Sequence, residues 1–309
     1  MILVAGSANL DFVVRAQHIP GPGETVLGQS FASYPGGKGA NQAVACARAG
    51  GAKTHMLVAM GQDAHATALL DSINSAGVQV CCIRSAQHAT GCAFICVDDN
   101  AENAITVAPG TNLDLAPEHL PELSGFSHLL MQLEIALPSV TAYALAARQR
   151  GVKVVLNAAP AQALSPQLLA AVDVLVVNEG ELAALVPQPM SLLTNLAQLP
   201  VPCVVVTLGA KGCLARLGNN FFVQAAYPVT AVDSTGAGDT FCGVLVAALD
   251  RSESLPEAMR LASAAAALAC SRPGAQASIP SAAEVQAFLA KHPDNDTDLL
   301  ELRRYCGLS

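Results

Sequence analysis

The most informative chemistry in the sequence lies in the run Val232-Asp-Ser-Thr-Gly-Ala-Gly-Asp-Thr-Phe241. A strand-like segment precedes this run and apolar residues at helical spacing follow it, so Gly236, Ala237 and Gly238 are predicted to begin a helix. The unpaired N–H groups and the dipole of a helix N-terminus favour an anion such as phosphate. Asp239 either complements that dipole or accepts the proton of a hydroxyl that attacks phosphorus.

A second glycine-rich run, Gly36-Gly-Lys-Gly-Ala-Asn-Gln-Ala43, also precedes a helical stretch. It is not a P-loop, because Ala32 and Gly39 stand where that motif needs Gly and then Ser or Thr. Lys38 and Asn41 could instead bind a polyhydroxylated ligand, with Lys38 close to a transferred phosphate. The competing interpretation is an ordinary glycine turn.

Polar residues also follow several predicted strands. Asn9 and Asp11 come after the first strand, where they either cap a turn or bind the neighbouring hydroxyls of a sugar. Because the carboxyl ends of parallel strands share one edge of a sheet, these ends predict a substrate crevice. The other residues of this kind are Gln132, Glu134, Asn157, Asn178, Glu181, Thr207 and Gly209.

Short runs of Val, Ile and Leu alternate with alanine-rich helical stretches, such as residues 138–150. Nearly continuous apolar strands that alternate with helices indicate an α/β fold, with a parallel sheet covered on both faces. The predicted strands are residues 1–5, 54–60, 128–132, 152–156, 172–177 and 203–208.

Two segments, 12–34 and 91–108, interrupt this alternation. They read as β-rich hairpins without a covering helix, and we expect them to form a small separate sheet that acts as a lid or a dimer surface. Ordinary surface hairpins are the alternative. The run His292-Pro-Asp-Asn-Asp296 is followed by a mildly helical stretch. We interpret residues 293–309 as an appended tail.

Composition excludes several classes of function. Of the 309 residues, 52% are hydrophobic and 13% are charged, which excludes a disordered chain. The net charge of −8 argues against nucleic-acid and anionic-membrane partners. No apolar run approaches the ~18 residues of a membrane span, and no basic segment of a signal peptide is present, so we expect a cytoplasmic protein. The ten cysteines lack metal-ligand spacing and are interpreted as reduced thiols.

Taken together, the runs Gly36–Asn41 and Gly236–Phe241 resemble the signatures of the ribokinase (PfkB-type carbohydrate kinase) family. The resemblance covers residues 1–290 and includes Asn9-x-Asp11, Asn178-x-x-Glu181 and the closing run 274–280. It implies a ribokinase-like three-layer α/β/α domain over residues 1–292, with a mostly parallel sheet and a β-sheet lid that often joins a homodimer. It also implies phosphorylation of D-ribose at O5 by ATP, giving D-ribose 5-phosphate.

The resemblance assigns roles to individual residues. Asp239 matches the catalytic base, and Gly236, Ala237 and Gly238 match the anion hole. The positions that match sugar contacts are Asn9, Asp11, Gly37, Lys38, Asn41 and Glu134. The positions that match the surroundings of ATP and Mg²⁺ are Asn178, Glu181, Thr207, Gly209, Gly212, Gly238 and Ser263, although relatives commonly carry Asn or His at the last of these.

A monovalent-cation site, usually for potassium, is a further feature of the family. A bound cation beside the anion hole would orient that loop and strengthen its field. The matching positions are Asp233, Thr235, Ala269, Arg272, Gly274 and Ser278, several of which would act through backbone carbonyls.

Three alternatives remain beside phosphorylation of ribose. The first is a related kinase of another small hydroxylated substrate, such as 2-deoxyribose, another sugar or a nucleoside. The second is a sugar-binding protein without catalysis, against which the intact Gly-Ala-Gly-Asp run argues. The third is a nicotinamide-dependent oxidoreductase, which the absence of GxGxxG after the first strand disfavours.

Overall fold

The protein is described by a computed structural model that covers residues 1–309 apart from 101, 187, 189 and 309. Nine strands of the described chain form the main sheet, in the order β13-β12-β11-β10-β9-β8-β1-β4-β5. Their bounds are β1 Ile2–Ala5, β4 Thr54–Met60, β5 Gln79–Arg84, β8 His128–Met131, β9 Lys153–Asn157, β10 Val174–Asn178, β11 Cys203–Thr207, β12 Gly212–Leu217 and β13 Asn220–Ala225.

The six strands predicted from the sequence all occur, and they pair in parallel. Ile2, for example, lies opposite Thr54 on one side and His128 on the other. Three strands were not predicted: β5 extends one edge in parallel, and β12 and β13 close the other edge as an antiparallel hairpin. The expected mostly parallel α/β sheet is confirmed.

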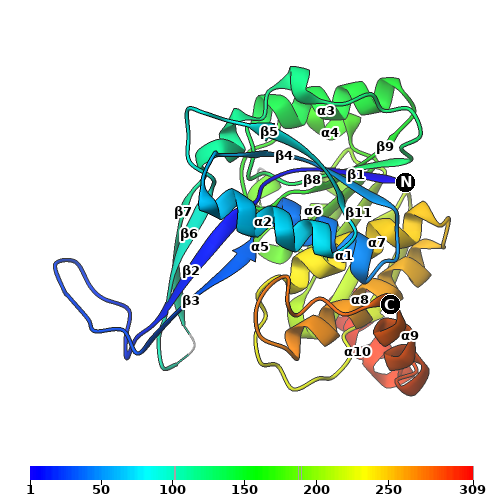
Figure 1. Ribbon diagram of the computed structural model, residues 1–309. Helices are drawn as coiled ribbons and strands as arrows, with labels where there is room; N and C mark the ends of the chain where they lie inside the picture. The colour runs from blue at the N-terminus through cyan, green and yellow to red at the C-terminus, as the bar shows by residue number, and fades with distance from the viewer. Residues whose placement is uncertain (101, 187, 189, 309) are drawn as a thin grey trace.

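Helices cover both faces of this sheet, so the side chains of each strand alternate between two cores. In β1, Ile2 and Val4 belong to one core, and Leu3 and Ala5 belong to the other. Figure 1 shows α3 and α4 on one side and α1, α7 and α8 on the opposite side. The helices of the Ile2 side are α1 Lys38–Arg48, α2 Ala64–Ser75, α7 Ala237–Asp250, α8 Leu255–Cys270 and α9 Ala282–Lys291. Those of the Leu3 side are α3 Leu137–Gln149, α4 Pro166–Ala171, α5 Glu179–Leu185, α6 Leu192–Gln198 and α10 Asp296–Tyr305.

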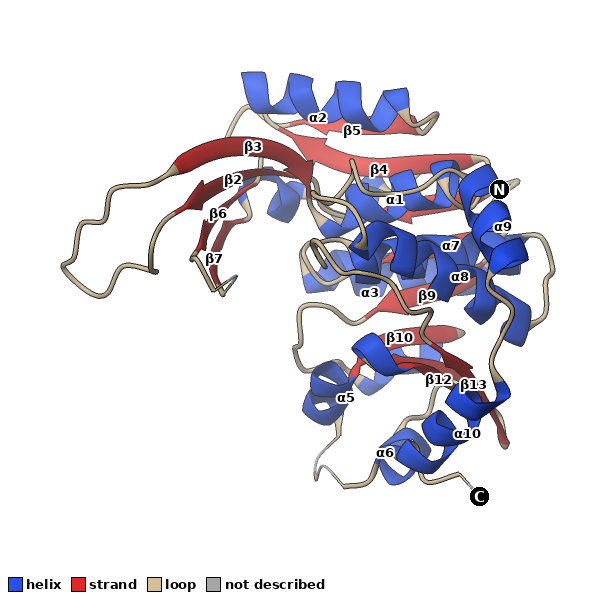
Figure 2. Cartoon of the chain, turned by 90° about the horizontal axis from the view of Figure 1, so that it is seen from below, coloured by secondary structure: helices blue, strands red, loops and turns tan. Residues whose placement is uncertain are grey.

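A second sheet stands apart from the main one, as expected from segments 12–34 and 91–108 (Figure 2). Its strand order is β3-β2-β6-β7, and its strands are β2 Asn9–Arg15, β3 Ser30–Gly36, β6 Cys92–Val97 and β7 Asn103–Ala108. The run Thr25-Val-Leu27, whose residue types favour a strand, lies instead in the loop between β2 and β3. Residue 101 of the second hairpin lies outside the described residues. We call this four-stranded unit the lid sheet.

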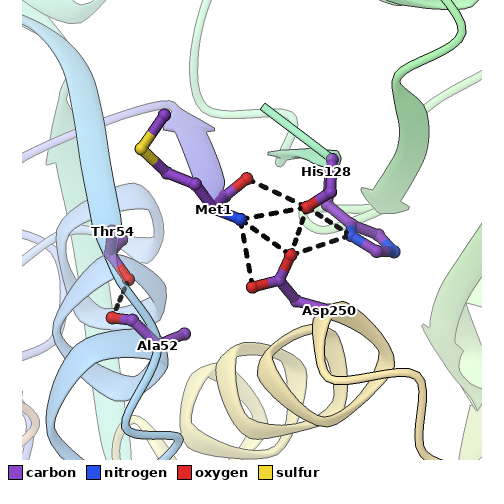
Figure 3. A network of polar contacts seen from close by, with 6 residues as sticks. Met1, Ala52, Thr54, His128 and Asp250 are labelled. Carbon is purple, nitrogen blue, oxygen red and sulfur yellow. Dashed lines mark hydrogen bonds and ion pairs between the residues drawn. The ribbon is translucent and has the colours of Figure 1, made fainter. Parts of the chain in front are cut away.

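A network of polar contacts ties the first residue to the end of α7 (Figure 3). The amino group of Met1 donates to Asp250 Oδ1 at 2.9 Å, and His128 Nδ1 lies 3.7 Å from the same oxygen. Ser127 Oγ also donates to Asp250. Although burial acts to raise it, these contacts hold the pKa of Asp250 below its usual value, so the ion pair keeps β1 and α7 together at neutral pH.

The remaining short elements are 3₁₀ turns. They are η1 Gly110–Asp114, η2 Pro117–His119 and η3 Gly209–Lys211. Across the described part of the chain, no helix combines the length and the apolar character that crossing a membrane requires.

Candidate active site

The glycine-rich run at 36–39 exists because α1 begins in direct contact with the backbone that follows β1. Gly37 has a φ of 87°, and a Cβ there would lie 2.7 Å from Ala8 Cα. A Cβ on Gly39 would lie 2.5 Å from the backbone nitrogen of Ser7. Only glycine fits such an approach, since real Cβ atoms do not come that close. The packing brings the start of α1 against the end of β1, where Lys38 and Asn41 were expected to act.

Glu134 is held by this junction. Its Oε2 accepts hydrogen bonds from Ser7 Oγ at 2.5 Å and from the backbone N–H of Lys38 at 3.0 Å, and Ser7 Oγ accepts one from the N–H of Gly39. Glu134 therefore anchors the N-terminus of α1. This structural role stands beside the sugar contact that the resemblance implies.

Asn9 and Asp11 both lie on β2, at the base of the lid sheet. Asn9 is buried, and its Oδ1 accepts a hydrogen bond from Asn112 Nδ2 at 2.7 Å. Burial, followed by the negative charges of Glu134 and Asp239 and opposed by Lys38, raises the pKa of Asp11 to about 7. The groups whose charges act on Asp11 come from widely separated parts of the chain.

The predicted anion site at 236–238 is the N-terminus of α7. Gly236 is the N-cap residue, with a left-handed φ of 74°. The N–H of Ala237 donates to Ser234 O at 3.2 Å, whereas the backbone amides of Gly236 and Gly238 donate to no group in the part of the chain that the structure describes. A Cβ on Gly238 would meet nothing within 4 Å. This helix end is therefore open to an anion.

Asp239, in the first turn of α7, is 8% exposed and is held by two side-chain amides of α1. Asn41 Nδ2 donates to its Oδ2, and Gln42 Nε2 donates to its Oδ1, both at 2.9 Å. The helices approach closely because residue 243 is glycine: a Cβ there would lie 2.6 Å from Ala45 Cβ. The close packing of α1 on α7 thus places Asp239 in a fixed orientation.

A chain of amides continues behind Gln42. Gln132 Nε2 donates to Gln42 Oε1 at 2.6 Å, and Gln42 Nε2 also donates to Asn157 Oδ1 at 3.0 Å. Two acceptors of this cluster, Asn41 Oδ1 and Gln132 Oε1, are buried and have no partner among the described residues. A buried acceptor without a partner is costly, so Asn41 Oδ1, on the side chain that donates to Asp239, is available to a ligand hydroxyl.

A hollow of about 230 Å³ lies beside this cluster and is lined by Asp239 and Asn157. It contains Lys38 and Asp239 together with Asn178 and Glu181 at the end of β10, so residues of both glycine-rich runs meet in one place. The negative charge of Asp239, against the effect of burial and with help from Glu134, raises the pKa of Lys38, which keeps its ammonium charged. The residues that line the hollow are Lys38, Asn157, Ala159, Val176, Val177, Asn178, Glu181, Thr207, Ser234, Gly236, Gly238, Asp239 and Cys242.

A larger cavity of about 850 Å³ begins at the same helix end. Gly238 lines both spaces, and most of the larger cavity is lined by small or apolar residues such as Val229 and Ala266. An apolar cavity of this size suits the base of a nucleotide whose phosphates lie toward α7. Five of the expected nucleotide positions line it: Thr207, Gly209, Gly212, Gly238 and Ser263.

Asn178 and Glu181 line only the smaller hollow, where they also form a capping box at the start of α5. Asn178 Oδ1 accepts from the Glu181 N–H, and Glu181 Oε2 accepts from the Asn178 N–H, both at 2.8 Å. Burial, opposed by that N–H and by Lys38, raises the pKa of Glu181. Mg²⁺ in kinase sites is usually held by one or two carboxylates, water and the substrate phosphates, and the donors here fit that pattern.

The expected cation positions lie partly side by side. Asp233 accepts hydrogen bonds from the N–H groups of Thr235 and Gly274, both at 2.9 Å. Although burial acts to raise it, these bonds hold the pKa of Asp233 below its usual value. The Arg272 side chain is paired with Glu284 at 2.6 Å, which leaves its carbonyl as the donor. In the described ranges no cluster of three His, Cys, Asp or Glu side chains could hold a metal ion. The resemblance implies a cation held mainly by backbone carbonyls, which suit hard cations.

Three residues with clear roles in this geometry were not singled out from the sequence. Gln42 directly follows Asn41 in the quoted motif, but nothing local shows that its amide faces Asp239. Asn112 lies in a 3₁₀ turn and holds Asn9. Tyr305 lines the larger cavity from the tail that sequence reasoning set aside.

Comparison with known proteins identifies the family of the chain. The sequence profile described as "pfkB family carbohydrate kinase" matches residues 1–282. The chain belongs to this family. It is therefore a carbohydrate kinase, and α10 lies beyond the matched residues.

Relatives with solved or curated identities agree with that assignment. The ribokinase of Haemophilus influenzae is 38% identical over 301 residues, which cover 93% of this chain and 98% of the relative. The structure of ribokinase from Thermotoga maritima is similar with a TM-score of 0.85 and 35% identity, over 94% of this chain and 99% of that one. Arabidopsis thaliana ribokinase, solved with ribose and ATP, is similar with a TM-score of 0.84 and 30% identity, over 93% and 98% of the two chains.

Proposed function

We propose that this kinase transfers the γ-phosphate of ATP to the primary hydroxyl of a pentose, with D-ribose as substrate and D-ribose 5-phosphate as product. The similarity to ribokinases, one of them solved with ribose and ATP, supports the choice of substrates. The observation that carries the proposal is the position of Asp239. Its carboxylate is buried and oriented by two amides at the open N-terminus of α7.

In the proposed mechanism, the sugar hydroxyl binds against Asp239. Each carboxylate oxygen accepts one amide hydrogen bond and keeps a second lone-pair direction for the hydroxyl. Asp239 takes the proton as the oxygen attacks phosphorus, which typically contributes about 10² to 10⁴ in rate. The bond from the γ-phosphorus to the bridging oxygen breaks, and ADP leaves.

Charge on the transferring phosphoryl group would be stabilised from two sides. The free amides of Gly236 and Gly238 point from the positive end of the α7 dipole, and Lys38 supplies a full positive charge. Asn9, Asp11, Gly37, Asn41 and Glu134 are proposed to surround the sugar. The unpartnered Asn41 Oδ1 is a ready acceptor for one of its hydroxyls.

Mg²⁺ would be held near Asn178 and Glu181, and it would screen the phosphate charge when bound. A monovalent cation such as potassium is proposed for Asp233, Thr235, Ala269, Arg272, Gly274 and Ser278. Its effect would be to orient the loop before α7, because Asp233 already binds the backbone of that loop and of Gly274.

The lid sheet is proposed to close over the sugar and to join two copies of the chain. Closure would exclude water and limit wasteful hydrolysis of ATP. The catalytic domain would comprise residues 1–292, and a cytoplasmic location remains a prediction from the sequence.

An assay of ADP release tests this function on a panel of ribose, 2-deoxyribose, hexoses and nucleosides, with and without potassium. We expect ribose to be the best substrate. Asp239→Asn should lower kcat by about 10² to 10⁴, while the Kd for ribose in calorimetry stays within about twofold, since the substitution keeps the shape of the side chain. Asp71→Asn on the exposed face of α2 is the matched control.

Two results would contradict the proposal. One is an Asp239→Asn variant that keeps more than a tenth of the wild-type turnover. The other is a wild-type protein that releases ADP with none of the sugars.

A further inference from the structure

The C-terminal helix α10 forms one wall of the larger cavity, although it lies beyond the residues that match the family. Asp298, Glu301, Leu302 and Tyr305 all line that cavity. Figure 2 shows α10 beside β13, with which it is in contact. The helix therefore borders the space that the proposed function gives to the nucleotide.

Helix α10 is packed against the core of the protein. Leu302 and Cys306 are each 3% exposed and belong to the core on the Leu3 side of the sheet. Just before the helix, Asp294 Oδ1 accepts hydrogen bonds from Gln224 Nε2 at 2.9 Å and from Tyr227 Oη at 2.8 Å. Apolar burial and these bonds fix the position of α10 on the main sheet.

Tyr305 contacts two other segments of the chain. Its hydroxyl donates to Glu179 Oε1 at 2.6 Å, and Lys211 Nζ lies 4.4 Å from the centre of its ring. Glu179 adjoins Asn178 at the start of α5, and Lys211 lies between Gly209 and Gly212 in the turn after β11. One side chain of the tail thus holds both segments where nucleotide contacts are expected.

The groups that line the cavity also differ in charge. Helix α10 contributes the carboxylates of Asp298 and Glu301, whereas α7 contributes its N-terminal residues Ala237 and Gly238. Because the carboxylates repel phosphate and the helix dipole attracts it, the phosphates of a nucleotide would be directed toward α7. The neutral base and ribose would then lie against α10.

We propose that α10 is a strap for the nucleotide site and that Tyr305 is a positioning residue that holds the β10–α5 and β11–β12 turns for ATP. This inference rests on the proposed function, because it assigns the larger cavity to ATP. Tyr305 acts through Glu179 and Lys211 and takes no part in the transfer itself. Loss of Tyr305 therefore weakens nucleotide binding and leaves the sugar site unchanged.

The test compares Tyr305→Leu, which removes both contacts, with Tyr305→Phe, which keeps the ring over Lys211 and loses only the hydroxyl. Calorimetry measures the Kd for ADP and for ribose, and kinetics measures KM for ATP and kcat. For Tyr305→Leu we expect the Kd for ADP and the KM for ATP to rise about tenfold, because a hydrogen bond and a cation–π contact are lost. For Tyr305→Phe we expect a rise of about threefold. The values of kcat and the Kd for ribose should stay within about twofold.

Leu300→Ala controls for a general effect on α10, because Leu300 is 54% exposed and does not line the cavity. Unchanged ADP affinity in both Tyr305 variants, or an equal loss of ADP and ribose affinity, would contradict the proposed role of Tyr305 and α10 in the nucleotide site. Should Tyr305→Leu fail to fold, the threefold effect of Tyr305→Phe decides the question alone. A wild-type protein that binds no ADP would refute the proposed function together with the strap, and that outcome is distinct from wild-type binding with unaffected variants.

Discussion

Gln42 Nε2 donates a hydrogen bond to Asp239 Oδ1 at 2.9 Å, across 197 positions of sequence. The direction of this bond is determined by a third residue: Gln132 Nε2 donates to Gln42 Oε1 at 2.6 Å, so the amide of Gln42 must present its hydrogens to Asp239. Gln42 is buried completely. It is therefore a positioning residue for the proposed base.

Replacing Gln42 tests that role. Gln42→Leu leaves Asp239 Oδ1 without its donor, and we expect kcat to fall about 10- to 100-fold, since a hydrogen bond to a charged group contributes about 1.5–3 kcal/mol. Gln42→Glu places a second carboxylate against Asp239, so the acid limb of the kcat profile should move to higher pH. Exposed Gln149→Leu is the control. An unchanged pH profile in Gln42→Glu would show that the contact does not affect catalysis.

Asp11 predicts a pH dependence of sugar binding. Its pKa of about 7 means that the carboxylate becomes ionised between pH 6 and pH 8. An ionised carboxylate accepts stronger hydrogen bonds from sugar hydroxyls, so ribose affinity should rise with pH over this interval by up to about tenfold. Calorimetry at three pH values measures it. A slope of the same size in Asp11→Asn would assign the effect to another group.

The same group affects stability in the opposite sense. Because the pKa of Asp11 is raised in the folded state, its contribution to stability is complete below about pH 4 and is lost as the pH rises through about 7. Asp11→Asn removes this loss. The Tm of Asp11→Asn should therefore exceed that of the wild type at pH 8, and the difference should shrink at pH 4 to 5. A difference that is independent of pH would contradict this origin.

The two glycines at the start of α7 predict different outcomes for the same substitution. Gly236 has a φ of 74°, so Gly236→Ala should destabilise the fold by about 1–2 kcal/mol. At Gly238 a Cβ meets no atom within 4 Å and would enter the phosphate space, so Gly238→Ala should keep the Tm and raise KM for ATP about tenfold. Thermal unfolding and steady-state kinetics separate the two effects. An unchanged KM for ATP in Gly238→Ala would contradict the placement of the phosphates beside Gly238.

The exposed apolar side chains of the lid sheet test its role as a dimer surface. Phe94 and Ile105 are 55% and 54% exposed, and strand alternation places them on opposite faces of the sheet. The double variant Phe94→Ser/Ile105→Ser should sediment as a monomer at concentrations where the wild type is a dimer. Leu217→Ser, on β12 of the main sheet and 42% exposed, is the control. A wild type that is itself monomeric would exclude the dimer.

Local pattern in the sequence was sufficient for much of the architecture. Runs of Val, Ile and Leu predicted six strands of the main sheet, and all six occur because a strand buried on both faces must be apolar along its length. The glycine runs likewise marked the starts of α1 and α7, since a left-handed N-cap or a close backbone approach requires that residue. The β12–β13 hairpin was missed, because no α-helix lies between β11, β12 and β13 to mark them as separate strands.

The contacts that orient the site depend on packing between distant segments, which no local pattern contains. Gln42 faces Asp239 only because Gly243 lets α1 approach α7, and the two residues share no periodicity or spacing along the chain. The tail could be predicted as helical, but its place against the larger cavity depends on burial of Leu302 and Cys306 in the core. Residue types and local spacing determine which elements form and which groups are reactive. Only the close packing of those elements decides which of the groups meet, because hydrogen bonds require approach to about 3 Å.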